Sequence, residues 1–245
     1  MKYGIIYCGY NTEEYIHDSL APWIERKDCV ISAVSVPFNE YYLQEFYEDS
    51  TTLILHDYFD AGKIAHLTTF PRFIKEHDAR NLALRKINEP VDAYFLVDSD
   101  EVYTKENIDN IFKFVEENPV CWYKVALKNF VFDKNTYLKE PFCPPRIFRT
   151  NFLGFSHPTF CWDNDMVYSN KEGQFTQNQL SGLEIPKEVA WVNHYSWLNN
   201  KISERKVQYQ KSRGWQCSYD WKEGEGLIFS EEYYKDKQLP ELEKL

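Results

Sequence analysis

The residues of this chain that could do chemistry gather at the end of one apolar segment. The run from Ala93 to Val97 is followed by Asp98, Asp100 and Glu101 within four positions. A continuous apolar run bounded by polar residues predicts a strand buried on both faces, so these acids should emerge at the carboxyl edge of a sheet. Side chains two positions apart in a strand point the same way, so Asp98 and Asp100 could share one divalent cation. The pattern predicts a site for a metal-bound nucleotide; the alternative is that the acids solvate a turn and cap a helix that begins near Thr104.

The elements that must position this strand alternate along the first half of the chain. Apolar patterns predict further strands over residues 3–8, 29–36, 53–56 and 121–127. Helical spacing and cap residues predict helices over 76–87, from Thr104 onward, and from Asn11 or Thr12 onward. Strands that alternate with helices predict an α/β fold with a Rossmann-type, mostly parallel sheet flanked by helices.

The second half of the chain has a weaker pattern. From Asn129 onward prolines cluster, aromatic residues are dense and no periodicity is strong, which is consistent with a pocket built over the sheet edge. Residues 201–213 have the composition of a charged helix, and the acidic tail over 223–245 is predicted to be peripheral. We therefore expect a single domain with a C-terminal extension.

Composition excludes several classes of protein. The chain has 245 residues, enough for one domain with a sizeable core, and its formal charge of -10 argues against general nucleic-acid binding. The six cysteines form no Cys-x-x-Cys pair, which favours reduced thiols over a zinc site or disulfide framework. No apolar stretch reaches the ~18 residues of a transmembrane segment and no leader pattern is present, so a cytoplasmic protein is expected.

Short motifs occur along the chain in an order that resembles a known family. They are Tyr10-Asn11-x-Glu13, Asp78-Ala79-Arg80-Asn81, Asp98-Ser99-Asp100, Arg146-Ile147-Phe148-Arg149 and His194-Tyr195-Ser196-Trp197. Together with the element pattern they resemble the inverting family-2 glycosyltransferases of GT-A fold, over about residues 1–200. In the metal-dependent members the Asp-x-Asp motif has this place in the order.

The resemblance implies a nucleotide-sugar donor, with a UDP-sugar as the expected choice. Tyr10 would stack on the base, Gly9 would allow close approach of the backbone, and Arg80 would lie near the diphosphate. The alternatives are that Tyr10 packs under its own helix and that Arg80 forms an ion pair with Asp78 or Glu76. Asp57 should follow the third strand and bind the base or ribose, or else be a turn aspartate. The full set of expected donor-binding residues is Gly9, Tyr10, Asn11, Asp57, Arg80 and Ser99.

Glycosyl transfer needs a cation at the leaving diphosphate and a base for the attacking hydroxyl. We expect Mn²⁺ or Mg²⁺ on Asp98, Asp100 and His194, with a core histidine as the alternative role for His194. The acceptor-side acid of the family is not in its usual place, so Asp163, Asp165 and His157 are the candidates for the catalytic base.

The resemblance also divides the chain and leaves alternatives open. Residues 1–128 would form the nucleotide-sugar-binding half, 129–200 the acceptor-binding half, and 201–245 the C-terminal helix and tail. The acceptor would be a glycan or another hydroxyl-bearing molecule. Asp98-Ser99-Asp100-Glu101-Val102 also matches the pattern of haloacid-dehalogenase-type phosphotransferases. A nucleotidyltransferase and a non-catalytic glycan- or nucleotide-binding protein remain further alternatives.

Overall fold

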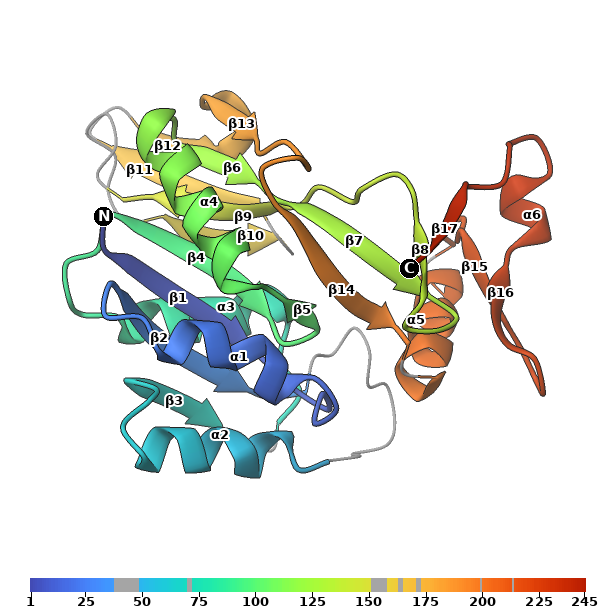
Figure 1. Cartoon of the computed structure of the whole chain (residues 1–245), viewed down its shortest axis with the longest axis horizontal. Coiled ribbons are helices and arrows are strands. Elements are labelled where there is room, and N and C mark those ends of the chain that lie inside the picture. Colours follow the sequence, from blue (N-terminus) through green and yellow to red (C-terminus); the bar gives the residue numbers. More distant parts are fainter. Residues whose placement is uncertain are drawn as a thin grey trace.

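The computed structural model places the acidic strand inside a seven-stranded sheet (Figure 1). The structure describes residues 1–37, 49–69, 72–150, 158–162, 165–170, 173–198, 200–212 and 214–245. The strand order is β13 (Gly182–Glu184), β6 (Trp122–Lys124), β9 (Pro145–Arg149), β4 (Ala93–Asp98), β1 (Tyr3–Cys8), β2 (Cys29–Ser35) and β3 (His66–Thr69). β3, β2, β1 and β4 are parallel, whereas β9 is antiparallel to both β4 and β6. The predicted α/β fold with a mostly parallel sheet is confirmed.

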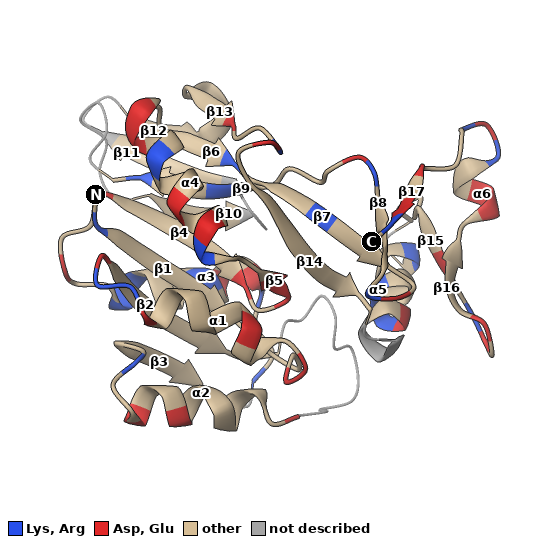
Figure 2. Ribbon diagram, in the orientation of Figure 1, with Lys and Arg blue, Asp and Glu red and all other residues tan. Residues whose placement is uncertain are grey.

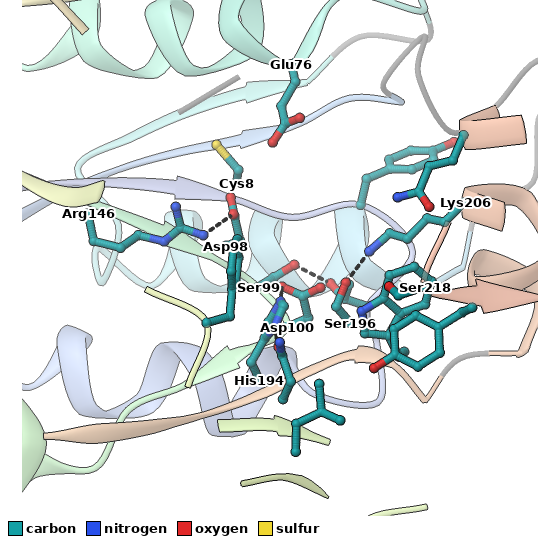
Figure 3. A pocket seen from close by; sticks show the side chains of 18 of the residues that line it. Cys8, Glu76, Asp98, Ser99, Asp100, Arg146, His194, Ser196, Lys206 and Ser218 are labelled. Carbon is teal, nitrogen blue, oxygen red and sulfur yellow. Dashed lines mark hydrogen bonds and ion pairs between the residues drawn. The ribbon is translucent and has the colours of Figure 1, made fainter. Parts of the chain in front are cut away.

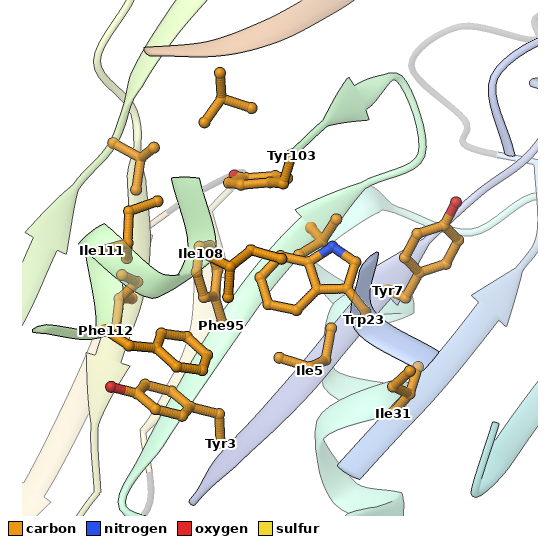
Figure 4. Close-up of a cluster of buried hydrophobic side chains, with 14 of the residues drawn as sticks. Tyr3, Ile5, Tyr7, Trp23, Ile31, Phe95, Tyr103, Ile108, Ile111 and Phe112 are labelled. Atoms are coloured by element: carbon orange, nitrogen blue, oxygen red, sulfur yellow. The ribbon is translucent and has the colours of Figure 1, made fainter. Parts of the chain in front are cut away.

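Helices cover both faces of this sheet, which explains why β1 and β4 are apolar throughout. α1 (Ile16–Ile24) and α4 (Lys105–Glu117) lie on one face, and α3 (Glu76–Lys86) lies on the other (Figure 1). On the first face Tyr3 stacks on Phe112 at 3.6 Å, and Trp23 packs edge-on against Phe95 (Figure 4). The alternate residues of the same strands face α3. The carboxyl ends of β1 and β4 are thereby held in place from both sides.

The helix boundaries follow their caps. Thr104 accepts a hydrogen bond from the Asn107 backbone N–H and forms a capping box that begins α4, as predicted. The first helix begins later than predicted, at Ile16 rather than just after Asn11 or Thr12. Asn11 has a φ of 55°, and the N–H groups of Tyr15 and Ile16 donate to the Thr12 carbonyl, so a turn separates β1 from α1.

Two of the predicted strands, over residues 53–56 and 121–127, differ in the structure. Residues 53–56 belong to α2 (Thr51–Asp60), and the third strand is β3 instead. A four-residue apolar run does not distinguish a strand from a helix segment, because periodicity needs a longer window. Residues 121–127 divide between β6 and β7 (Ala126–Val131), which belong to different sheets.

A five-stranded sheet brings the second half of the chain to the acidic turn. Its order is β17 (Leu242–Lys244), β8 (Thr136–Leu138), β7, β14 (Trp191–Trp197) and β5 (Glu101–Val102). β14 is parallel to β7 and antiparallel to β5, so His194 lies opposite both Asn129 and Glu101. A separate three-stranded sheet contains β10 (Thr159–Trp162), β11 (Asp165–Asn170) and β12 (Gly173–Thr176).

The C-terminal part is built from α5 (Asn200–Ser212), the β15 (Tyr219–Lys222) and β16 (Gly226–Phe229) hairpin, and α6 (Glu231–Tyr234). The helix predicted over 201–213 is confirmed as far as Ser212, and residue 213 lies outside the described residues. The tail was predicted to be peripheral, and this is wrong, because Tyr233 and Tyr234 line a cavity described below and β17 pairs with β8. None of the helices in the described ranges has the length and apolar character of a membrane span. In Figure 2, β1 and β14 carry no charged residue, so the charges nearest the cavity come from strand ends and helices.

Candidate active site

A cavity of about 540 Å³ lies at the carboxyl ends of β1 and β4. On one side it is lined by Glu76, Arg80, Asp98, Asp100 and Arg146, and on the other by residues of β14, α5, β15 and α6. This edge is where parallel α/β sheets bind ligands, because the connections after the strands diverge there. The cavity therefore contains the acidic motif that the sequence singled out.

Five charged side chains form what we call the ionic chain: Glu76, Arg80, Asp98, Arg146 and Glu101, of which Arg80, Arg146 and Glu101 are buried and the other two are partly buried. Arg80 Nη2 donates to both carboxylate oxygens of Asp98, at 3.1 and 3.2 Å, and also to Glu76. Arg146 Nη2 donates to Asp98 Oδ2 at 3.1 Å, a contact drawn in Figure 3, and its Nε donates to Glu101 Oε1 at 2.8 Å. The Glu101 carboxylate also accepts a hydrogen bond from Tyr103. Acidic and basic groups alternate along the ionic chain, so each of the two guanidinium groups contacts two carboxylates.

Two carboxyl groups of the ionic chain, the central Asp98 and the terminal Glu101, ionise differently. Burial opposes ionisation of Asp98, but Arg80 and Arg146 outweigh it, so the pKa of Asp98 is lowered and the carboxylate stays charged. Burial raises the pKa of Glu101 to about 7, although Arg146 acts against this rise. Asp98 is thus a fixed anion whose oxygens are held by two guanidinium groups.

Asp100 and His194 face each other beside the ionic chain. His194 Nε2 lies 3.8 Å from Asp100 Oδ1, and the His194 side chain is 12 % exposed. His194 Nδ1 contacts the Asn129 Oδ1 atom, which can only accept a hydrogen bond, so we assign the imidazole proton to Nδ1. Burial lowers the pKa of His194 to about 4, against the opposing effect of Asp100. The imidazole is therefore neutral at physiological pH, with an unprotonated Nε2 atom that lies 3.8 Å from Asp100 Oδ1.

This pair fits a divalent cation that is shared with a ligand. Each metal–ligand bond to Mg²⁺ is about 2.1 Å, so one ion can contact two atoms 3.8 Å apart. Within the part of the chain that the structure describes, no group of three or more His, Cys, Asp or Glu side chains could hold a metal. Asp98, expected as the third ligand, forms ion pairs with Arg80 and Arg146 in this structure, and its role as a ligand stays a prediction. A bound ion would take its remaining ligands from diphosphate oxygens and water, as Mg²⁺ commonly does.

The expected donor-binding residues separate into two groups. Tyr10, Arg80 and Ser99 line the cavity, whereas Gly9 and Asn11 do not. A Cβ atom on Gly9 would lie 3.1 Å from the Ser99 side chain, so the glycine allows β1 to pack against the acidic turn. Asn11 Oδ1 accepts a hydrogen bond from the Asp49 N–H, which places its side chain within the loop.

The prediction for Asp57 rested on a strand that does not exist. Asp57 is exposed on α2, and it does not line the cavity. Of the three base candidates, His157 and Asp163 lie outside the described residues. Asp165 begins β11, but its side chain also lies outside the described part. Their role stays a prediction.

Sequence reasoning missed three parts of the site. Asn129 contacts His194 because β7 and β14 pair in register, and no local motif reveals this pairing. Glu101 was read only as one acid of a motif, although its carboxylate is the buried partner of Arg146. The aromatic residues of the C-terminal tail were assigned to the periphery. A search for charged residues in buried segments could have found Glu101, but not the other two.

Comparison with known proteins gives fold-level likenesses. No known protein family matches this chain, and no curated protein matches it. Among solved structures, S. aureus TarS residues 1 to 349 in complex with UDP-GlcNAc is 16 % identical over 86 % of this chain, with a TM-score of 0.49. The mannosyltransferase PcManGT from Pyrobaculum calidifontis in complex with GDP-Man and Mn²⁺ is 13 % identical over 86 % of this chain, with a TM-score of 0.48. These alignments span 65 % and 64 % of the two structures, respectively.

Proposed function

We propose that this protein is a glycosyltransferase that moves a sugar from a nucleotide-sugar donor, a UDP-sugar in our proposal, to an acceptor hydroxyl. The observation that carries the proposal is the Asp100–His194 pair, which lines the cavity. Its Oδ1 and Nε2 atoms are 3.8 Å apart, and the imidazole is neutral. A carboxylate and an imidazole can hold Mn²⁺ or Mg²⁺ while leaving coordination positions for diphosphate oxygens. The cation, when bound, would neutralise the charge that develops on the leaving diphosphate.

The proposed reaction forms one bond and breaks one bond. The acceptor oxygen bonds to the anomeric carbon of the sugar, and the bond from that carbon to the diphosphate oxygen breaks. The diphosphate leaves with the electron pair, and the hydroxyl proton passes to a base and then to solvent. Asp163, Asp165 and His157 remain our candidates for this base, and an attack from the face opposite the diphosphate would invert the anomeric configuration.

Contacts within the protein would fix the turn and the loop that we propose bind the donor. Arg80 and Arg146 hold Asp98 in one position, so the turn that carries Asp100 begins from a fixed strand end. Ser99 donates its backbone N–H to the Cys8 carbonyl and its hydroxyl contacts Thr12 Oγ1 at 2.7 Å, which ties the same turn to the loop after β1. Tyr10 lines the cavity from that loop, where a base could stack on its ring.

Release of a nucleoside diphosphate tests the proposal. The protein is incubated with UDP-glucose, UDP-GlcNAc and GDP-mannose, with Mn²⁺ or EDTA, and free nucleoside diphosphate is measured. We expect slow metal-dependent hydrolysis of one donor, which Asp100→Asn abolishes and the exposed control Asp57→Asn leaves unchanged. Release of phosphate from a phosphomonoester instead would support the phosphotransferase alternative, and donor binding without any hydrolysis would support the non-catalytic alternative. The anomeric configuration of a transfer product, read by NMR, tests inversion.

A further inference from the structure

The side of the cavity that faces away from the ionic chain is lined by aromatic rings. We call this surface the aromatic wall: Phe142, Trp197, Tyr219, Tyr233 and Tyr234. They come from the segment before β9, from β14 and β15, and from α6. Figure 3 shows Lys206, Ser196 and Ser218 on this side of Asp100, with Arg146 and Asp98 on the other.

Four of the five rings of the aromatic wall belong to one network of ring contacts. The ring centroids of Trp197 and Tyr219 are 4.8 Å apart, and those of Tyr233 and Tyr234 are 4.7 Å apart. Phe229 links the two pairs, at 5.6 Å from Tyr219 and 5.7 Å from Tyr234. Such contacts limit the motion of these four rings, so this part of the wall is organised before a ligand arrives.

The wall presents apolar area to the cavity. Phe142 is 48 % exposed, and Trp197, Tyr233 and Tyr234 are half-buried although all four line the cavity. Large aromatic side chains that remain exposed within a concave site are typical of ligand-binding surfaces. The exposed rings are thus available to a bound molecule.

Charge is scarce on this side of the cavity. Among the described residues that line it, Lys206 carries a charge, whereas Ser196, Gln210 and Ser218 are neutral hydrogen-bonding groups. Lys206 contacts the Ser196 hydroxyl and lies 5.5 Å from the centre of the Trp197 ring. The wall therefore combines flat apolar faces with neutral donors and acceptors.

We propose that the aromatic wall is an acceptor subsite for a neutral saccharide, an inference that rests on the proposed glycosyl transfer. A pyranose ring has an apolar face of C–H groups, which matches an aromatic ring, and a rim of hydroxyls, which matches Gln210 and Ser218. A lipid chain would leave these polar groups unsatisfied, and desolvating them costs free energy. An anionic acceptor would find Lys206 alone on this side and would face Asp98 and Asp100 across the cavity.

Binding of neutral trisaccharides tests the subsite. Maltotriose, cellotriose and triacetylchitotriose are titrated into the full chain with UDP and Mn²⁺ present, and binding is followed by saturation-transfer NMR. We expect at least one to bind, with a Kd about fivefold higher in Phe142→Ala and in Tyr233→Ala. The control is Phe59→Ala, because Phe59 is 40 % exposed on α2 and does not line the cavity. The two test residues lie on different segments, so misfolding of one variant leaves the other informative.

The outcomes separate this inference from the proposed function. If UDP with Mn²⁺ raises the melting temperature but no trisaccharide binds at millimolar concentration, the saccharide subsite is wrong and the transferase proposal stands. Farnesyl phosphate binding that is weakened in Phe142→Ala would also overturn the saccharide assignment, in favour of a lipid-linked acceptor. If neither UDP nor Mn²⁺ changes the melting temperature, the proposed function itself fails. If Phe59→Ala weakened trisaccharide binding as much as Phe142→Ala and Tyr233→Ala, the aromatic wall would not be the binding surface.

Discussion

The ionic chain and the aromatic wall face each other across one cavity, yet they are built in opposite ways. Arg80 is completely buried and Glu101 is completely buried, and their charges are satisfied by partners inside the protein. The aromatic wall keeps part of its surface exposed, as the 48 % exposure of Phe142 shows. The ionic chain is fixed by contacts within the protein, whereas the aromatic wall has exposed ring surface that a ligand could contact. We infer that the ionic chain positions the turn for which we propose metal binding, and that the aromatic wall binds a ligand.

The largest expected effect comes from breaking the ionic chain. Arg146→Met leaves the buried Glu101 without its cationic partner and leaves Asp98 with Arg80 alone, so we expect the free energy of unfolding to fall by about 3–5 kcal/mol. Urea denaturation measures this fall. Arg26→Met is the matched control, because Arg26 pairs with the more exposed Asp28 and Asp109, and its loss should cost about 1 kcal/mol or less. Equal losses of unfolding free energy in the two variants would contradict the structural role of the ionic chain.

A smaller effect concerns the pH dependence of stability at the border between the two regions. The unfolded His194 gains a proton near pH 6.5, whereas burial lowers the pKa of the folded residue to about 4. The unfolded state therefore binds more protons between these values, so the free energy of unfolding should decrease as the pH falls from 6.5 to 4. The decrease should be on the order of 3 kcal/mol in metal-free protein. In His194→Gln this part of the pH dependence should vanish; parallel curves for the native protein and the variant would refute the buried neutral state.

The support of His194 by Asn129 should have a moderate effect on metal binding. Asn129→Ala removes the acceptor of the Nδ1 proton, and the loss of such a partner commonly weakens metal affinity by at least about tenfold. Electron paramagnetic resonance of free Mn²⁺ measures this affinity directly. Asn193→Ala is the control, since Asn193 is on the same strand but does not line the cavity. Unchanged Mn²⁺ affinity in Asn129→Ala would show that the imidazole needs no such support.

The smallest expected effect is on the stability contributed by the aromatic wall. Phe142→Ala should lower the free energy of unfolding by less than about 1 kcal/mol, because nearly half of its side chain already contacts solvent. Phe148→Ala should cost about 3–5 kcal/mol, because Phe148 is completely buried in the core on the α3 face. Thermal or urea unfolding provides both numbers. A large loss in Phe142→Ala would make the wall a structural element rather than a ligand surface.

The sequence could predict the parts of the fold that local patterns encode. β1 and β4 are continuous apolar runs, and α4 combines a Thr104 cap with apolar residues at helical spacing, so these elements were identified with nearly correct bounds. α2 was misread because the apolar residues at 53–56 form too short a run to show a period. For the same reason the apolar run at 121–127 did not reveal that it divides between β6 and β7.

Local pattern identified the part of the site whose residues are neighbours in sequence, whereas Tyr10, Arg80 and His194, which also line the cavity, were predicted from the family resemblance. Asp98, Ser99 and Asp100 were found because one strand carries them to the sheet edge. Whether Asp98 contacts a metal or a guanidinium depends on Arg80 and Arg146, which reach it from α3 and β9. The aromatic wall depends on a C-terminal segment whose place is fixed by β17 pairing with β8. Such contacts between distant segments leave no periodic pattern in the sequence.

The central claim is that Asp100 and His194 hold a divalent cation together with the donor diphosphate. Titration of Mn²⁺ into the protein with and without UDP, followed by electron paramagnetic resonance, tests it most directly. We predict that UDP tightens Mn²⁺ binding in the native protein, and that Asp100→Asn and His194→Gln each weaken the binding at least tenfold, while Asp57→Asn leaves it unchanged. Native Mn²⁺ affinity in both Asp100→Asn and His194→Gln would contradict the claim.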